Sequence, residues 1–243
     1  MVSCAPTTMR PSIGDRMARS LKGIALVVTL GTLLSKAGGL VRQLVIAAAF
    51  GVGAAYDAYN YAYVLPGFLL ILLGGINGPF HSAMVSVLSR RPRAEGAHIL
   101  AALNTSVSAL LLLVTLLLVL AADPLITLVG PGLSPELHAI ATVQLQLMAP
   151  MALLAGLIGL GFGSLNAADE FWIPAISPLM SSAALVVGVG LLWWQLGSGI
   201  TLPAAAMSGG VVLALATLVG ALLQWLIQLP ALIRQGLARF QLV

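Results

Sequence analysis

Two basic residues lie inside an apolar stretch of this 243-residue chain. Lys36 and Arg42 fall within residues 23–50, with Gly38 and Gly39 between them. A cation near the middle of a bilayer costs roughly 2.5–3.5 kcal/mol on insertion scales, so such residues are expected to face a water-filled cavity or a charged partner. An ammonium and a guanidinium group in one cavity suit an anionic substrate, such as a phosphate or pyrophosphate headgroup.

The spacing of the two cations limits this interpretation. Six residues at about 100° each place Lys36 and Arg42 about 120° apart around a helix, so one narrow stripe cannot hold both. A wide cavity would hold them, and so would a bend at Gly38 and Gly39. The alternative is snorkelling: Arg42 lies eight residues before Phe50 and can extend toward the nearer interface.

An acidic residue and four tyrosines follow the first apolar stretch. Asp57 lies within a segment that also contains Tyr56, Tyr59, Tyr61 and Tyr63. Tyrosines concentrated in this way favour a belt at the membrane interface. Asp57 is typical of a residue that caps the next helix, where a carboxylate satisfies free backbone N–H groups. It could also pair with Arg42 or form a gate, and the sequence leaves both interpretations open.

The second apolar stretch contains a predicted helix break. Gly74, Gly75, Gly78 and Pro79 fall within six residues, and broken helices at membrane depth are tolerated where they line a cavity. Asn77 and His81 are four residues apart, so they share a face if the helix resumes, and both are candidate cavity-lining residues. For His81 an interhelical hydrogen bond is favoured over a proton relay. The candidate hinge residues are Gly38, Gly39, Gly74, Gly75, Gly78 and Pro79.

The composition indicates the class of protein in which these residues lie. Charged residues make up 7% of the chain, hydrophobic residues 60%, and the mean hydropathy is +1.06. A soluble domain of this size could not cover its surface with so few charges, so the sequence predicts an integral membrane protein. The same numbers exclude a disordered chain, a nucleic-acid binder and a disulfide scaffold, since Cys4 is the only cysteine.

Enzymatic chemistry has no support in the sequence. Three scattered histidines and one cysteine form no metal-ligand set, and neither a nucleophile elbow nor a phosphate-cradling loop is present. We therefore expect no catalytic residues, no metal and no cofactor.

Six apolar stretches are long enough to cross a membrane, which takes about 20 helical residues. No alternation of period two indicates a barrel. The sequence thus predicts an all-α polytopic bundle at residues 23–233, after a basic N-terminal segment at 1–22 and before a tail at 234–243. Trp172 and Trp193 stand at the two ends of the fifth stretch, as interfacial belts require. The stretches are 23–50, 59–88, 99–122, 140–165, 172–196 and 202–233.

Basic residues outside the spans predict the orientation. If six helices alternate, nine of them lie on one side and the opposite connections contain no Lys or Arg. Because short cytoplasmic connections are rich in Lys and Arg, both termini are expected to be cytoplasmic. The nine are Arg10, Arg16, Arg19, Lys22, Arg90, Arg91, Arg93, Arg234 and Arg239.

The fourth stretch carries a packing pattern. Pro150 predicts a kink. Ala155, Gly159 and Gly163 follow at four-residue spacing, which is typical of close helix–helix packing in membranes.

An ordered series of motifs resembles the MurJ/MviN family of lipid II flippases. It begins with Ser35-Lys36-x-x-Gly39-x-x-Arg42 and continues from about residue 20 through nearly the whole chain. The later motifs are Phe50-Gly51, Asp57-Ala58-Tyr59-x-x-Ala62-Tyr63-x-x-Pro66, Gly78-x-Phe80, Pro131-Gly132, Leu165-Asn166, Phe171-x-Ile173-Pro174-Ala175-x-x-Pro178 and Gln228-Leu229-Pro230.

The resemblance implies a two-lobed exporter fold in the bacterial plasma membrane. Such proteins move a lipid-linked anionic substrate, the undecaprenyl-pyrophosphate-linked peptidoglycan precursor, to the outer leaflet by alternating access. Lys36 and Arg42 match the basic residues of the first helix that are proposed to meet the pyrophosphate, and Asp57 matches an acidic residue of the family. Its partners would be membrane lipids and a second lobe, and nucleic acid is not among them.

Two departures qualify the resemblance. The family often has Arg after the Leu-Pro of the second helix and Glu shortly before Gly-x-Phe, whereas Gly67 follows Pro66 here and Asn77 precedes Gly78. Six spans match only the first lobe, which suggests truncation in the tail at 234–243, with the second lobe or another copy completing the protein. The rivals are a polysaccharide-lipid or drug exporter of the same fold and a non-transporting membrane scaffold.

Overall fold

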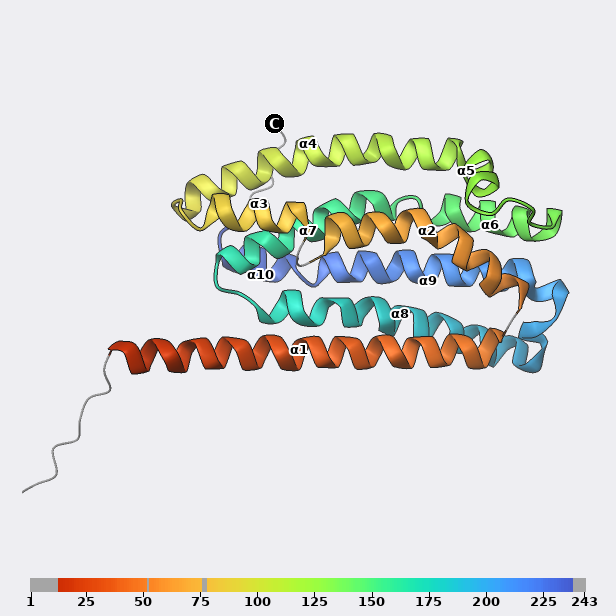
Figure 1. The fold of residues 1–243 in the computed structure, drawn as a ribbon, viewed down its shortest axis with the longest axis horizontal. Coiled ribbons are helices and arrows are strands. Elements are labelled where there is room, and N and C mark those ends of the chain that lie inside the picture. The colour runs from red at the N-terminus through yellow and green to blue at the C-terminus, as the bar shows by residue number, and fades with distance from the viewer. Residues whose placement is uncertain (1–12, 52, 76–77, 238–243) are drawn as a thin grey trace, which may run out of the picture.

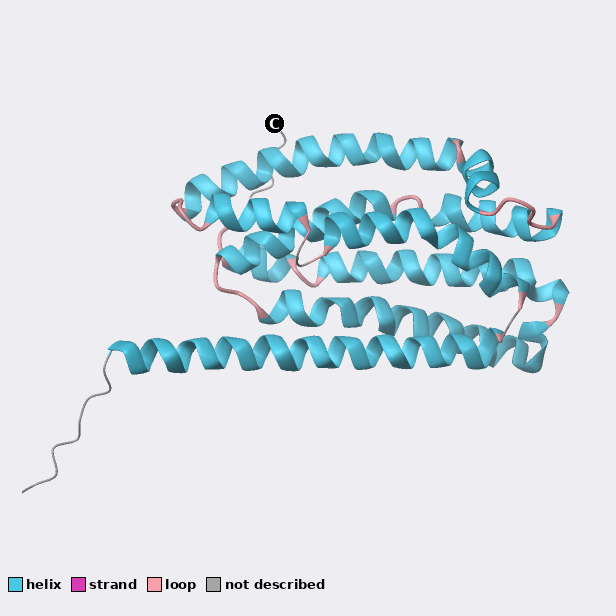
Figure 2. Cartoon of the chain, viewed as in Figure 1, coloured by secondary structure: helices cyan, strands magenta, loops and turns pink. Residues whose placement is uncertain are grey.

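The computed structural model describes residues 13–51, 53–75 and 78–237, and every regular element in these ranges is a helix (Figure 2). Two short 3₁₀ segments, Gly197–Thr201 and Pro203–Ala205, join α8 to α9. The α-helices are α1 (Ile13–Phe50), α2 (Ala54–Gly74), α3 (Pro79–Leu88), α4 (Arg93–Leu120), α5 (Ala122–Val129), α6 (Pro135–Met148), α7 (Met151–Ala167), α8 (Trp172–Leu196), α9 (Ala206–Leu226) and α10 (Leu229–Arg234).

The six predicted spans are confirmed as six helical segments long and apolar enough to cross a membrane. The fifth coincides with α8 to the residue, and the first ends at Phe50 as expected but begins earlier, at Ile13. The second, fourth and sixth spans are each made of two helices: α2 with α3, α6 with α7, and α9 with α10. The polytopic α-helical bundle predicted from composition is therefore the observed fold.

The predicted break in the second span lies between Gly74 and Pro79. Gly75 and Gly78 both have extended backbone, and the Gly78 N–H donates to the Gly75 carbonyl at 2.9 Å. A Cβ at either position would lie 2.5 Å from a backbone carbonyl oxygen, of Ile71 or of Leu72. Glycine is therefore required here by close backbone approach. Pro79 then starts α3 at a position where its missing N–H removes no helical hydrogen bond.

The helices form layers across the bundle (Figure 1). α1 packs on α8, α8 packs on α9, and α9 in turn contacts α2, α6 and α7. α4 covers the opposite side of α7 from this series, so α1 and α4 are the outer helices. The layered order leaves α1 with α8 as its main neighbour.

α7 is the central helix, and its glycines allow its neighbours to approach closely. A Cβ on Gly159 would collide with the Leu73 carbonyl of α2, and one on Gly163 would lie 2.5 Å from the Met84 Cβ of α3. Residues 158–165 of α7 are all buried. The small-residue pattern predicted for the fourth span is thus confirmed as a packing surface, and α6 ends and α7 begins on either side of Pro150, as the predicted kink requires.

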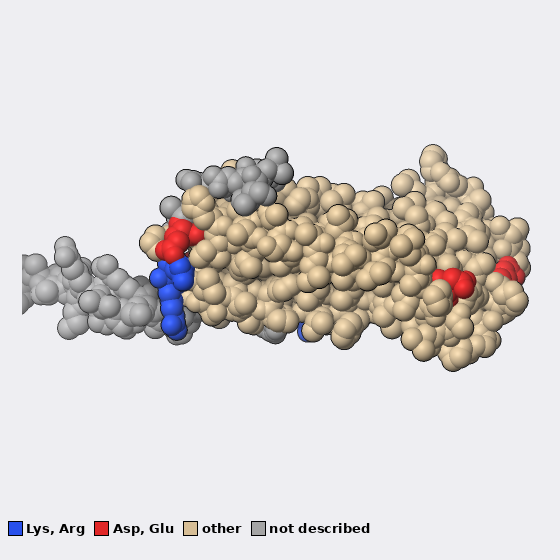
Figure 3. All heavy atoms as spheres, turned by 90° about the horizontal axis from the view of Figure 1, so that it is seen from above, with Lys and Arg blue, Asp and Glu red and all other residues tan. Residues whose placement is uncertain are grey.

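Most charged side chains lie at the two ends of the bundle. Most Lys and Arg atoms visible in Figure 3 gather at one end, beside an acidic residue, whereas the other end of that face shows only Asp and Glu. Arg90 and Arg91 follow α3 at the first end, and Arg91 pairs with Glu95. Asp123 and Glu136 lie on α5 and α6 at the second end. The tryptophans Trp172 and Trp194 are exposed at opposite ends of α8.

Candidate functional site

The first helix is attached to the bundle along a seam of small residues. A Cβ on Gly31 would lie 2.7 Å from the Ala175 Cβ, and one on Gly38 would collide with Leu179, both on α8. Ser35 lies between them and donates its hydroxyl proton to the Ala175 carbonyl at 2.6 Å. Small side chains therefore let α1 lie against α8, as in other close membrane helix pairs.

Arg42 continues this seam one turn further along α1. Positions 31, 35, 38 and 42 are spaced by four, three and four residues, so they lie on one face of the helix. The Arg42 side chain is partly buried, and its Nε atom is buried with no hydrogen-bond partner among the described residues. No ion pair within 4.0 Å joins Arg42 to Asp57 in the part of the chain that the structure describes. The protein thus leaves a charged donor unsatisfied inside a membrane span.

Lys36 lies on a different side of α1, as the sequence spacing predicts. Lys36 is exposed and stands seven residues, about two turns, before Gln43, so the two share a side of the helix. Gln43 donates from Nε2 to the Tyr56 hydroxyl on α2 at 2.8 Å. Lys36 therefore lies on the side of α1 that turns toward α2, and Gly39 between them has open space where a Cβ would be.

The tyrosines of α2 form a stacked column instead of the predicted interfacial belt. The ring centroids of Tyr56 and Tyr59 are 6.1 Å apart and those of Tyr59 and Tyr63 are 5.4 Å apart, with interplanar angles of 17°. Tyr59 is 7% exposed, and Gly67 leaves the space that the Tyr63 ring fills. Only Tyr61, on another face, is exposed as a belt residue would be. The belt interpretation is therefore wrong for Tyr59, because its spacing of three and four residues from Tyr56 and Tyr63 turns all three to one face.

The column is joined to α1 next to Arg42, since the following residue, Gln43, bonds to Tyr56. The Tyr59 hydroxyl lies 2.9 Å from Thr217 Oγ1 on α9. The column of phenol groups from α2 and the Thr217 hydroxyl from α9 therefore lie together in this part of the lobe, whereas Lys36 lies on another side of α1 from Arg42. Sequence reasoning missed Gln43, Thr217 and the column; the three- and four-residue tyrosine spacing was the signal that could have found it.

Asp57 has neither a capping hydrogen bond nor an ion pair within 4.0 Å with a described residue. Gly53 is the N-cap of α2, and Asp57 lies in the first turn, where its charge is favourable beside the helix N-terminus. The role of Asp57 as a gate stays a prediction.

Of the remaining predicted site residues, one has the predicted contact, one lies outside the described residues, and the hinge positions stay predictions. His81 on α3 forms an interhelical hydrogen bond, with the Asn166 amide nitrogen of α7 2.8 Å from its Nε2 atom, as the favoured alternative predicted. Asn77 lies outside the described residues. α1 continues without a break through Gly38 and Gly39, so a bend at the glycines is not how this structure accommodates the two cations (Figure 1). Hinge motion at the six candidate positions stays a prediction.

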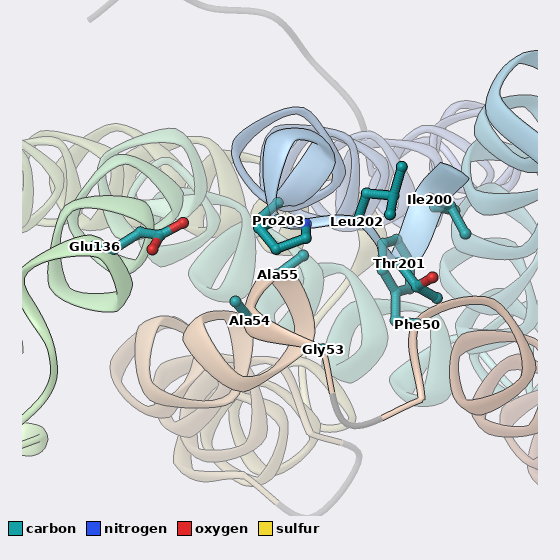
Figure 4. Close-up of a pocket in the computed structure, with 10 residues that line it drawn as sticks. Phe50, Gly53, Ala54, Ala55, Glu136, Ile200, Thr201, Leu202 and Pro203 are labelled. Atoms are coloured by element: carbon teal, nitrogen blue, oxygen red, sulfur yellow. The ribbon is translucent and has the colours of Figure 1, made fainter. Parts of the chain in front are cut away.

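A concave feature lies at the opposite end of the bundle from Arg90 and Arg91. It is an open cavity of about 480 Å³ between the start of α2, the start of α6 and the 3₁₀ connection before α9. Glu136 is its only charged lining residue, and Figure 4 shows this carboxylate pointing toward Pro203. Most of the lining is apolar, including Phe50, Ile200 and Leu202. Neither Lys36 nor Arg42 lines it.

Comparison with known proteins identifies the family. A family model described as lipid II flippase MurJ matches residues 46–242. The chain belongs to the MurJ family. The probable lipid II flippase MurJ of Synechocystis sp. is 53% identical over 234 residues, which are 96% of this chain and 44% of that protein. The probable lipid II flippase MurJ of Thermotoga maritima is 28% identical over 67% of this chain and 34% of its own length.

A solved MurJ structure shares the fold. The structure, described as lipid II flippase MurJ in an inward closed conformation, aligns with a TM-score of 0.71 at 23% identity over 90% of this chain and 43% of that chain. This chain therefore spans less than half the length of each of these MurJ relatives. Its six spans have the architecture of one lobe of a two-lobed MurJ protein, as the sequence resemblance implied.

Proposed function

We propose that this chain is the N-terminal lobe of a lipid II flippase, which moves an undecaprenyl-pyrophosphate-linked precursor to the outer leaflet. The observation that carries the proposal is the unsatisfied Nε donor of Arg42 in a membrane span of a MurJ-family chain. A buried donor without a partner is costly, and more so when it is charged. A structural scaffold gains nothing from that cost, whereas an anionic headgroup would satisfy the guanidinium with two hydrogen bonds at once.

The arrangement of α1 supports alternating access. Arg42 and Lys36 would bind the pyrophosphate from one helix, and α1 is fastened mainly to α8 by a seam of small residues. Small residues allow one helix to slide or rock on another without repacking large side chains. The glycine break between α2 and α3 provides a second place where the lobe can bend. Paired-lobe transporters expose such a site first to one side of the membrane and then to the other.

We place both termini in the cytoplasm. The separation of cations and carboxylates to opposite ends of the bundle supports this orientation (Figure 3). A reporter that is active only outside the cytoplasm, fused after Val243, should be silent, and the same reporter inserted in the α8–α9 connection after Ser198 should be active. The reverse result would contradict the orientation.

Transfer requires a second wall for the cavity, supplied by a second lobe or another copy of the chain. Without it, the sugars and pyrophosphate of the substrate would meet lipid beside α1. We expect no precursor transfer by a reconstituted monomer of this chain and transfer when the other lobe is supplied. Robust transfer by a demonstrated monomer would refute this requirement.

The central experiment is purification of the chain with native lipids, followed by mass spectrometry for a bound polyprenyl pyrophosphate. We expect the lipid to be recovered with the wild-type chain and lost from Arg42→Ala. Recovery of a different lipid-linked glycan would favour the polysaccharide-lipid exporter of the same fold, and recovery of the precursor with a folded Arg42→Ala chain would remove Arg42 from the site.

A further inference from the structure

A hydrogen bond joins two polar side chains of α1 and α2. Gln43 donates from Nε2 to the Tyr56 hydroxyl at 2.8 Å, and both residues lie in segments apolar enough to cross a membrane. Gln43 is exposed and Tyr56 is partly buried. Polar side chains in such segments are costly beside lipid, so they are expected to face protein, water or a ligand.

This bond leaves part of the pair unused. The Gln43 amide has two N–H donors and a carbonyl oxygen, and only one N–H is engaged by a described residue. The Tyr56 oxygen accepts that N–H, so its own proton has no acceptor in the part of the chain that the structure describes. The pair therefore presents an acceptor, Gln43 Oε1, beside a donor, the Tyr56 O–H.

These two groups are held in place from behind. The Tyr56 ring stacks on Tyr59 with centroids 6.1 Å apart, and Tyr59 is buried and lies within 2.9 Å of the Thr217 hydroxyl. The bond to Tyr56 in turn sets the plane of the Gln43 amide. Groups that are fixed before a ligand arrives lose little freedom when it binds.

The pair lies on the side of α1 that carries Lys36. Lys36 and Gln43 are seven residues apart, which is two turns and about 10 Å along the helix axis. Gly39 lies between them, and nothing is within 4 Å of the position that a Cβ would take there. This side of α1 therefore has a cation at one point, a polar pair two turns further on, and an open position at Gly39 between them.

The free donor and acceptor fit a sugar ring. Neighbouring ring carbons of a sugar carry O–H or N–H donors beside oxygen acceptors, so one sugar can donate to Gln43 Oε1 and accept from the Tyr56 hydroxyl at the same time. A few placed amide and hydroxyl groups of this kind orient ligands in binding sites. In a sugar pyrophosphate the ring follows the phosphates directly, so a pyrophosphate bound by Lys36 and Arg42 would bring its sugar to the neighbouring Gln43.

We propose that Gln43 and Tyr56 bind the first sugar of the substrate headgroup: Gln43 Oε1 accepts a hydrogen bond from an N–H or O–H of the sugar, and the Tyr56 hydroxyl donates to a neighbouring sugar oxygen. This inference rests on the proposed function, in which Lys36 and Arg42 bind the pyrophosphate. It separates the two tasks, because the cations recognise charge and the uncharged pair recognises what is attached to it.

The test compares two probes of equal charge. One is farnesyl-pyrophosphoryl N-acetylglucosamine, and the other is farnesyl pyrophosphate capped with a methyl ester in place of the sugar. Both are titrated against the whole chain in lipid nanodiscs, and the readout is the ratio of their dissociation constants. We expect the wild type to bind the sugar probe about tenfold more tightly, the effect of two neutral hydrogen bonds.

Substitutions in the pair should remove this preference and nothing else. Gln43→Leu should bring the ratio close to one, and Tyr56→Phe, which keeps the stacked ring, should reduce it to about threefold. Both variants should bind the methyl-capped probe like the wild type. Tyr61→Phe, on the exposed face of α2, is the matched control and should keep the wild-type ratio. Tyr56→Phe decides the question if Gln43→Leu does not fold.

Two results would overturn the sugar site. If the wild type shows no preference, or if both variants keep it, the pair does not recognise the sugar. If both variants weaken the two probes equally, the bond between Gln43 and Tyr56 only joins α1 to α2.

Arg42→Ala distinguishes this inference from the proposed function. It should weaken the binding of both probes and leave their ratio unchanged. If it changes neither dissociation constant, the proposed pyrophosphate site fails, whereas the ratios in the Gln43 and Tyr56 variants still decide the sugar site.

Discussion

α7 and α1 are both apolar helices of the same lobe, but they meet their surroundings in opposite ways. The apolar segment that contains α7 is 72% buried, against 17% for the apolar segment of α1. α7 contacts neighbours on all sides through glycines, whereas α1 contacts α8 through one seam and leaves leucines such as Leu30 and Leu40 exposed. The comparison indicates that the centre of the lobe is built for rigid packing, and that the unsatisfied charge lies on an outer helix most of whose surface is exposed.

The largest effect is expected from a methyl group added to α7, the central helix. Gly159→Ala would push a Cβ into the Leu73 backbone carbonyl, which cannot move aside without disturbing the α2–α3 break. We expect a loss of about 3 kcal/mol of stability, at the upper end for overpacked cores. Thermal unfolding in detergent measures it. Gly39→Ala on α1, where nothing lies within 4 Å, is the matched control and should be neutral or slightly stabilising.

Arg42→Ala should affect function without loss of stability. The guanidinium has no ion pair among the described residues, and removing a cation from a membrane span relieves an insertion cost of about 2.5–3.5 kcal/mol. Bound lipid should be lost while the unfolding temperature stays the same or rises. Arg42→Lys should retain part of the binding, since it keeps the charge without the two-pronged geometry. A fall in stability that Asp57→Ala reproduces would indicate a structural pair instead.

A methyl group added in the seam between α1 and α8 should cost more stability than one on open surface and less than one on α7. Gly31→Ala brings two methyl groups to 2.7 Å, but α1 can move outward into lipid to relieve the contact. We expect a loss of about 1 kcal/mol, the lower end for an added methylene. Gly23→Ala on the same helix, with nothing within 4 Å, should show no loss. A loss at Gly31 as large as that at Gly159 would contradict the contrast between the two helices.

The smallest effect is expected at the basic end of the bundle. Arg91 pairs with Glu95 four residues later, and both side chains are about half exposed. Exposed pairs of this kind contribute about 0.3–0.5 kcal/mol, so Arg91→Ala should hardly change thermal unfolding. Replacing Arg90 and Arg91 together should instead reduce the fraction of correctly oriented chains in a reporter assay, because short basic connections set topology.

Helix existence and helix breaks could be predicted because they depend on local chemistry. The six spans follow from hydropathy and length, and the interruptions at Gly74–Pro79 and Pro150 follow from residues that cannot continue a helix. The interhelical bond of His81 is predictable for a similar reason, since a polar group in a span needs a partner.

The site could be predicted only in part, because its partners come from distant segments. Arg42 and Lys36 are recognisable as charges in an apolar stretch. Thr217 lies 158 residues from Tyr59, and nothing in the sequence links them before the fold places α9 beside α2. The tyrosine column was misread because tyrosine is common at membrane interfaces, and the general preference outweighed the helical spacing that turns Tyr59 inward.

The burial of α7 has a consequence for how the lobe is made. A new membrane helix first meets lipid, and one carrying Gly159 and Gly163 offers lipid a grooved, weakly packed surface. Its contacts with α2, α3 and α4 are all with segments synthesised earlier, whereas its contacts with α8, α9 and α10 must wait for the rest of the chain. We therefore expect biogenesis to proceed in two stages: α7 docks against the earlier helices as it emerges, and the layer of α8, α9 and α1 closes over it last.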